Sequence, residues 1–350
     1  AGPGTTPHVG DDGVALQTLQ AVVIARGEEE QFIRGAHWAI EDSMYPDELL
    51  EAWGTREEQA LGTSASLSFG HLADERRAAG SGMGVPQAAR GAVVYVATQV
   101  SEALRLPPGS EEQVVVMMDT YCRRRLILPD LGQIPAAVVA ICYILYKKHT
   151  SADLVDTRLL LSAADWCALW LHEAGLAASA QTLTAMDLLV QEVDVLQALE
   201  WRTQVPTVHS WLTAFCARLD AATWGELKVP LDSILDQGIS FARAAQQHIS
   251  ALDAPPRRVA VGVLCHGLVA ARLLHVDMIC PQKAAAEWEP LFADGTIDTD
   301  DQHPPSTNLQ ACMLDLLQLA ADATAASLQQ DSLSVARLVS YFPPEFLVPP

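Results

Sequence analysis

The chain has 350 residues, half of them hydrophobic and 6% aromatic, and carries a formal net charge of −21. This charge argues against broad contact with nucleic acid, because affinity for nucleic acid comes largely from Lys and Arg side chains on phosphates. The longest apolar run, residues 134–146, is shorter than the roughly 18 residues that a membrane span needs. We therefore expect neither a nucleic-acid partner nor a membrane. The abundance of Ala, Leu, Val and Gln favours helix over sheet.

The first 85 residues are predicted to form an N-terminal extension. Residues 1–12 are expected to be disordered, and residues 14–53 have the apolar spacing of one or two helices. Residues 54–85 are rich in Gly, Ser and Ala, which predicts a flexible linker. The run Gly80–Gly84 resembles a phosphate-binding loop, but no strand precedes it, and this favours the linker.

Helical patterns then follow one another without a credible strand. Ser110, with Gln113 three positions later, has the pattern of a capping box. Pro135 opens a helix that is apolar on all faces. Trp166 and Trp170 are four residues apart, so we expect both to face the core. The five predicted helices cover residues 85–106, a segment starting at 110, 135–148, part of 152–180, and 181–200.

A second group of helices begins at Thr207, a residue type that caps helix starts. Its predicted helices cover residues 208–219, 230–252, 255–274, 282–292 and 307–329. Cys265 is embedded in the Pro-started, almost wholly apolar helix 255–274, 123 residues after Cys142 in the similar helix 135–148. This similarity hints at a duplication. We therefore predict an all-α fold of two tandem five-helix bundles, residues 86–213 and 214–330, with additional N-terminal helices and a tail at 331–350.

The seven cysteines predict buried, reduced thiols, because several lie in apolar helical runs and no Cys-x-x-Cys pair occurs. We find no secretory signal, and no zinc-protease, Walker or nucleophile-elbow motif. The sequence thus predicts an intracellular protein, nuclear or cytoplasmic, that is not an enzyme. It predicts no catalytic residue, metal site or cofactor.

Several residues of the first bundle occur in an order that resembles the cyclin family. Asp119 follows Arg90 by 29 residues and begins Asp-Thr-Tyr, similar to the Asp-Arg-Phe-like triplet of cyclins. Residues 144–148, Ile-Leu-Tyr-Lys-Lys, are similar to the family's Leu-x-x-Lys helix ending. Residues 192–212 contain Glu-Val-Asp-Val-Leu, then Leu-Glu-Trp, then Pro-Thr and Trp-Leu, which is close to the family pattern over this segment.

The resemblance covers residues 86–215 better than 216–330, and it implies a regulatory subunit of a cyclin-dependent protein kinase with two cyclin-box bundles. In cyclins, a Lys and a Glu lie side by side on the kinase-facing surface. Here the resemblance implies Lys148 and Glu192, with Lys147 as the alternative if the register shifts by one residue. The other implied residues are Leu145, His149, Leu196 and Trp201 at the kinase interface, and Arg90 with Asp119 as a buried structural pair.

The chain also departs from the family. Residues 89–96 lack the Met and Trp with which many cyclins recruit substrates, so we do not expect that docking site. Glu192 lies 44 residues after Lys148, more than is common in the family. This spacing predicts an insertion at about 150–180, either a decoration of the fold or a contact with a third protein.

Three functions remain open from the sequence. The first is a cyclin that activates a cyclin-dependent kinase in cell-cycle or transcription control. The second is a cyclin-fold adaptor in a transcription complex that activates no kinase, and the third is an unrelated helical scaffold. Lys148 can also be a solvated helix cap, and Leu196 can belong to the core.

Overall fold

The computed structural model describes residues 47–61, 84–125, 131–150, 157–177, 182–223, 225, 227–248, 250, 255–280, 291–292, 307–321 and 323–339. Every regular element within these residues is helical, so the predicted all-α fold is confirmed. None of these helices is both long and apolar enough to cross a membrane. The predictions for residues 1–46, 62–83 and 341–350, and most of the helix predicted at 282–292, lie outside the described residues.

The helices divide between two compact units, each described by itself. The first unit includes residues 51–212 and 237–260, and the second includes residues 213–236 and 261–339. The predicted boundary after residue 213 is close to the first break, but the units share the chain in alternating segments. One reason lies within the first unit, where the Arg90 and Gln87 side chains donate to the carbonyls of Gln246 and Gln247. Such contacts join residues about 156 to 160 positions apart, which helical periodicity does not reveal.

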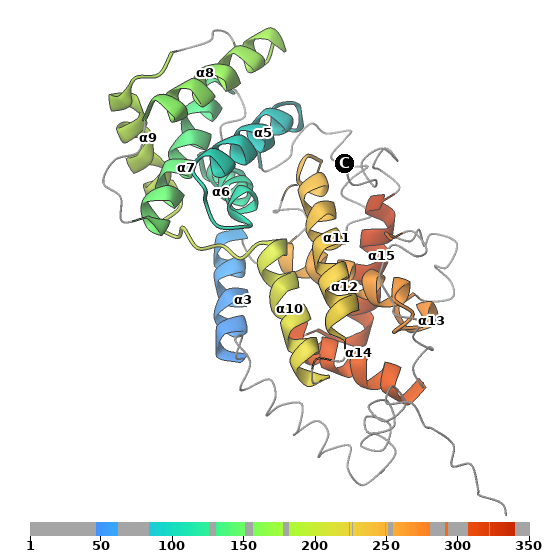
Figure 1. Ribbon diagram of the computed structural model, residues 1–350. Coiled ribbons are helices and arrows are strands. Elements are labelled where there is room, and N and C mark those ends of the chain that lie inside the picture. The colour runs from blue at the N-terminus through green and yellow to red at the C-terminus, as the bar shows by residue number, and fades with distance from the viewer. Residues whose placement is uncertain are drawn as a thin grey trace, which may run out of the picture. The chain divides into compact units, whose positions relative to one another are not determined.

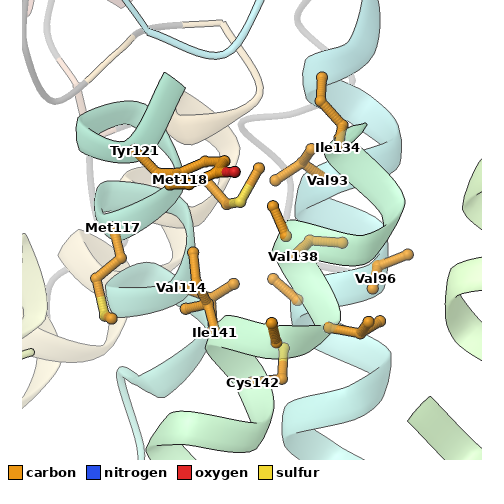
Figure 2. Packing of buried hydrophobic residues seen from close by; sticks show 14 of the residues in the cluster. Val93, Val96, Val114, Met117, Met118, Tyr121, Ile134, Val138, Ile141 and Cys142 are labelled. Atoms are coloured by element: carbon orange, nitrogen blue, oxygen red, sulfur yellow. The ribbon is translucent and has the colours of Figure 1, made fainter. Parts of the chain in front are cut away.

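Five helices of the first unit form a bundle around α7 (Figure 1). They are α5 (Gln87–Ala103), α6 (Ser110–Arg125), α7 (Ile134–His149), α8 (Thr157–Glu173) and α9 (Ala185–Ala198). α7 contacts each of the other four, and its residues from Ile134 to Cys142 are all buried. Figure 2 shows Val138, Ile141 and Cys142 of α7 packed among apolar side chains of α5 and α6. An all-round apolar helix at the centre of a bundle is what the sequence predicts.

Arg90 and Asp119 form a buried two-pronged ion pair between α5 and α6. Nη1 and Nη2 of Arg90 donate to the two carboxylate oxygens of Asp119 at 2.7 and 2.9 Å. The backbone N–H of Val85 also donates to Asp119, at 2.8 Å, and Nε of Arg90 donates to the carbonyl of Gln246 at the end of α11 (Lys228–Gln246). The pair therefore fixes the start of α5 and satisfies a helix end, where a cation is favourable.

The segment predicted as an insertion contains α8, which is the fourth helix of the bundle and packs against α5 and α7. The prediction that both tryptophans face the core is wrong for Trp166, which is exposed, while Trp170 is half-buried and packs against the core. The buried stripe of α8 consists instead of Leu160, Ala164, Cys167, Ala168 and Leu171. Smaller side chains fit here because α8 approaches two helices at once.

The prediction of a flexible linker from residue 54 onward is wrong for residues 54–61, because these residues belong to α3 (Asp47–Leu61). Gly54, Glu57, Ala60 and Leu61 are buried at helical spacing. Glu57 accepts a hydrogen bond from the indole N–H of Trp211 and, at 3.3 Å, one from the backbone N–H of Arg257. Burial raises the pKa of Glu57 to about 7. The residues after Gly54 are mostly good helix formers, and the Gly and Ser content further along outweighed them in the prediction.

The second unit contains most of α12 (Pro256–Ala270), together with α13 (Val276–Ile279), α14 (Thr307–Ala321) and α15 (Ala325–Val339). Like α7, α12 begins with Pro and is buried on all sides from Val259 to Leu268. The remaining helix, α10 (Val208–Ala222), begins after Thr207, whose hydroxyl accepts from the backbone N–H of Ser210 at 3.2 Å as the sequence predicts.

The predicted boundary between the second bundle and the tail, at residues 330 and 331, falls inside α15 and is wrong. Asp331, Ser332, Val335 and Ala336 are buried on this helix. Two of them pack against α12, since a Cβ added at Gly262 would lie 2.5 Å from Val335 and 2.8 Å from the carbonyl of Asp331. α15 therefore belongs to the core of the second unit.

Candidate partner-binding surface

The C-terminal end of α7 lies beside α9, where Lys147 forms an ion pair with Glu192. The ammonium of Lys147 is 2.8 and 3.0 Å from the two carboxylate oxygens and 4.5 Å from the ring centre of Tyr143. The hydrogen bond to Glu192 raises the pKa of Lys147. The predicted pairing of Glu192 with Lys148 is therefore wrong by one residue. Consecutive helical residues point about 100° apart, and the packing of α7 turns Lys147 toward α9.

Lys148 points instead toward α3. Burial, together with the positive charge of Arg56, lowers the pKa of Lys148. Among the described residues, the ammonium of Lys148 makes no hydrogen bond or ion pair. His149, the last residue of α7, is exposed, and burial and the charge of Lys148 lower its pKa. Of the two lysines at this end of α7, Lys147 is paired with Glu192, and Lys148 has no ion pair within the described residues.

The predicted apolar interface residues separate into three environments. Leu145 is fully buried in the bundle core, so the prediction that it contacts a partner is wrong. It lies on the face of α7 that the other helices cover. Leu196 is partly buried against the same core, which agrees with its alternative assignment. Trp201 is 67% exposed and is available to a partner.

The backbone holds Trp201 in an unusual conformation. Its φ is 62° and that of Glu200 is 52°, a left-handed region that side chains with a Cβ rarely adopt. The N–H of Trp201 donates to the carbonyl of Leu196 at 2.8 Å and closes the end of α9. Glu200 bonds to Arg124 at 2.9 Å and to Arg202 at 3.2 Å. Left-handed residues also end α5 at Arg105 and α12 at Arg272, so this turn is a common helix end, and here it presents a large indole to solvent.

A row of exposed apolar side chains along α9 was missed by the sequence prediction. Met186, Leu189, Val190 and Val193 are between 46% and 67% exposed. Their spacing places them on one face of the helix. The residues of α9 that enter the core are Leu188, Val195 and Leu199. The sequence of α9 contains more apolar residues than one buried stripe requires, and this excess could have indicated the exposed row.

The start of α9 is well defined, so this row is presented on a regular helix. Thr184 and Asp187 form a capping box, in which each side chain bonds to the backbone N–H of the other at 3.2 and 2.9 Å. We call the α9 row of Met186, Leu189, Val190 and Val193, together with the Lys147–Glu192 pair and Lys148, the α7–α9 surface. It combines apolar area, a fixed ion pair and an unneutralised cation.

The chemistry of other side chains gives no competing site within the described residues. No group of three or more His, Cys, Asp and Glu side chains could hold a metal ion in this part of the chain. The six described cysteines are buried, and burial raises the pKa of Cys142 to about 12. A thiol with such a pKa is a poor nucleophile at neutral pH.

No protein-family model matches the chain, and neither the curated proteins nor the solved structures contain a protein with detectable similarity to it.

Proposed function

We propose that this chain is a regulatory subunit, similar to a cyclin, that binds and activates a cyclin-dependent protein kinase through the α7–α9 surface. The observation that carries the proposal is the exposed apolar row of α9, the same helix whose Glu192 forms the ion pair with Lys147. Soluble proteins rarely leave such a contiguous apolar face open unless a partner covers it.

The apolar row suits a helix of the kinase. Residues spaced along one face of a helix pack into the matching face of a partner helix. Each large apolar side chain that leaves water on binding contributes roughly 1.5–3 kcal/mol. The row of α9 supplies Met186, Leu189 and Val190 as the centre of this contact, and Val193 lengthens it by one further turn.

The charged residues supply orientation. Glu192 holds Lys147 in place, while Lys148 is left to bond with carbonyls or a carboxylate of the kinase. Carbonyls at a helix end favour a nearby cation. Lys148 is exposed and has no ion pair within the described residues, so it can gain one when the complex forms, which favours this orientation over others.

Activation would follow from the position of the kinase's regulatory helix. Packing against the α7–α9 surface turns this helix inward, so that the kinase completes its own Lys–Glu ion pair and orders its activation loop. The subunit contributes binding and no catalytic group. The contact is expected to be large, with a few apolar anchors dominating its energy.

The test is kinase binding and activation by the full chain and its variants. Purified cyclin-dependent kinases are mixed one by one with the wild type, Val190→Asp and Lys148→Glu, and phosphorylation of a histone peptide is measured. We expect Val190→Asp to weaken binding by about 10-fold or more, since it places a charge in the apolar contact. Lys148→Glu should weaken binding and leave folding intact.

Val229→Asp is the matched control. Val229 lies on α11 and is 45% exposed, so it resembles Val190 in type and in exposure but is outside the α7–α9 surface. This variant should bind and activate like the wild type. Failure of every kinase to bind the wild type, or equal binding by Val190→Asp and Val229→Asp, would remove the proposal.

A further inference from the structure

A second exposed apolar patch lies on α5 and α8, away from the residues assigned to the kinase. Tyr95 and Trp166 stack with their ring centres 4.4 Å apart and their planes tilted by 33°. Together with Leu169, these side chains are between 38% and 49% exposed. Aromatic rings that stack on each other while facing solvent supply a rigid apolar platform.

Gly91 lies one helical turn before Tyr95, on the same face of α5. It sits inside the helix, where Gly is less favourable than Ala. A Cβ added at Gly91 would meet nothing within 4 Å, whereas at Gly262 and Gly267 it would come within 3.0 Å of Val335 and Ile234. The described part of the fold thus gives no steric reason for Gly at position 91.

We infer that Gly91, Tyr95, Trp166 and Leu169 form a docking surface for a helix of a protein other than the kinase. The absent side chain at Gly91, with the exposed Ala88 one turn earlier, lets the backbone of the partner approach α5 closely. The stacked rings and Leu169 then form a wall along one side of the approaching helix. The surface is independent of the α7–α9 surface and does not rest on the proposed kinase.

Charge indicates the chemistry of this partner. Asp165 is exposed beside Trp166, and Glu102 is exposed two turns after Tyr95, while the exposed Arg158 lies two turns before Asp165 on α8. The whole chain carries a net charge of −21, which disfavours association of two copies. The surface therefore fits a helix that is small and apolar at its centre and basic at its edges.

The first experiment asks whether Gly91 has a role inside the fold. Gly91→Ala should raise the midpoint of thermal unfolding by about 1 °C, because Ala favours the helix and meets no clash. A lower midpoint would show that the fold itself requires Gly at this position, and it would overturn the inference.

The second experiment uses a display library of 20-residue helical peptides selected on the full chain. The enriched peptides should carry small residues at the centre and Lys or Arg at the edges. They should bind Gly91→Gln at least 10-fold more weakly than the wild type, because the new side chain occupies the approach. Ala103→Gln, a change at an exposed position about 120° around α5, should leave their binding unchanged.

Each other outcome overturns the inference. Peptides that bind Gly91→Gln as well as the wild type would use a different surface. A failure to enrich any peptide would mean that no such helix fits. If sedimentation instead detects a dimer that Gly91→Gln dissociates, the occupant of the surface is a second copy of this chain.

Discussion

The central helices α7 and α12 share a plan, but the polar groups buried around them differ. Both begin with Pro, are apolar on nearly every side, and bury one thiol, at Cys142 and Cys265. Near α7, the buried polar groups are acids and a charged pair, Arg90 with Asp119. Where α12 meets α15, the buried polar groups are Asp331, serines and a neutral imidazole. The imidazole of His266 lies 2.8 Å from the carbonyl of Ser332 and accepts from the N–H of Leu291 at 3.2 Å. One hydrophobic pattern is thus compatible with different buried polar groups.

The two helices also make room for their neighbours differently. α7 uses alanines, such as Ala137 and Ala140, along its buried faces. α12 uses Gly262 and Gly267, where even a Cβ would collide with α15 or α11. Close approach through Gly brings the backbones of two helices together, while Ala leaves space for the larger side chains of the neighbouring helix. The two cores should therefore respond differently to the same kinds of substitution.

The largest effect is expected at the charged pair. Asp119→Ala leaves the buried guanidinium of Arg90 without its carboxylate, and breaking a buried pair in this way costs about 3–5 kcal/mol. Urea unfolding of the variant and the wild type measures this loss. Asp187→Ala, which removes one half of an exposed capping box, is the control and should cost much less than the loss of the buried pair. Equal losses in the two variants would contradict the structural role of the pair.

The next effect is the acid sensitivity of His266. Burial lowers its pKa from 6.5 to about 4, so between these values the unfolded chain binds a proton that the folded chain does not. Stability should therefore fall by about 3 kcal/mol as the pH falls from 6.5 to 4. Unfolding of wild type and His266→Gln is compared across this range. The variant should lose less stability than the wild type as the pH falls. An equal loss in both proteins would show that His266 does not cause this acid sensitivity.

Glu57 should make folding stability depend on pH in the opposite direction. Its pKa is raised from 4.5 to about 7, so in this range the folded chain keeps a proton that the unfolded chain releases. Stability from this group should be greatest below pH 4.5 and should decline by about 3 kcal/mol as the pH rises to 7. Glu57→Gln, which mimics the protonated acid, should flatten that decline. A decline that persists unchanged in the variant would mean that Glu57 titrates as an exposed acid.

A smaller loss is expected where α12 meets α15. Gly262→Ala places a methyl group 2.8 Å from the carbonyl of Asp331, so α15 must shift. Overpacking of this kind costs about 1–3 kcal/mol. Ala137→Gly in α7 is the reverse test, with a loss of about 1 kcal/mol from backbone entropy and the lost methyl. If Gly262→Ala is neutral in thermal unfolding, the close approach of α12 and α15 is wrong.

Patterns local to the sequence predicted much of this fold. The apolar run of α7 and the Thr207 cap follow from neighbouring residues alone. The resemblance to cyclins brought Arg90 and Asp119 together as a pair, and the structure places them in contact. Glu192 was also chosen correctly as the partner of a lysine at the end of α7.

The wrong predictions share a physical cause. Each concerns a feature that depends on contacts between segments far apart in the sequence. Adjacent lysines differ only in which neighbour they face, so the choice between Lys147 and Lys148 depends on where α9 packs. The helical end of α3 depends on Arg123, which donates to the carbonyls of Ala60 and Leu61 from α6. The sequence did not reveal that apolar residues of α9 are exposed, because periodicity reports apolar character and does not show which residues another segment covers.

The smallest effect on folding is expected at the Lys147–Glu192 pair. Variants of this pair can therefore lose binding to a partner while they keep nearly all of their folding stability. Lys147 is exposed, so Lys147→Ala should cost under about 1 kcal/mol in urea unfolding. Arg125→Ala removes a comparable ion pair with Asp194, two residues from Glu192 on α9 and on a different side of the helix, and should cost a similar amount. Under the proposed function, kinase activation should fall with Lys147→Ala and stay unchanged with Arg125→Ala. Equal activation by both variants would assign the Lys147–Glu192 pair to the fold alone.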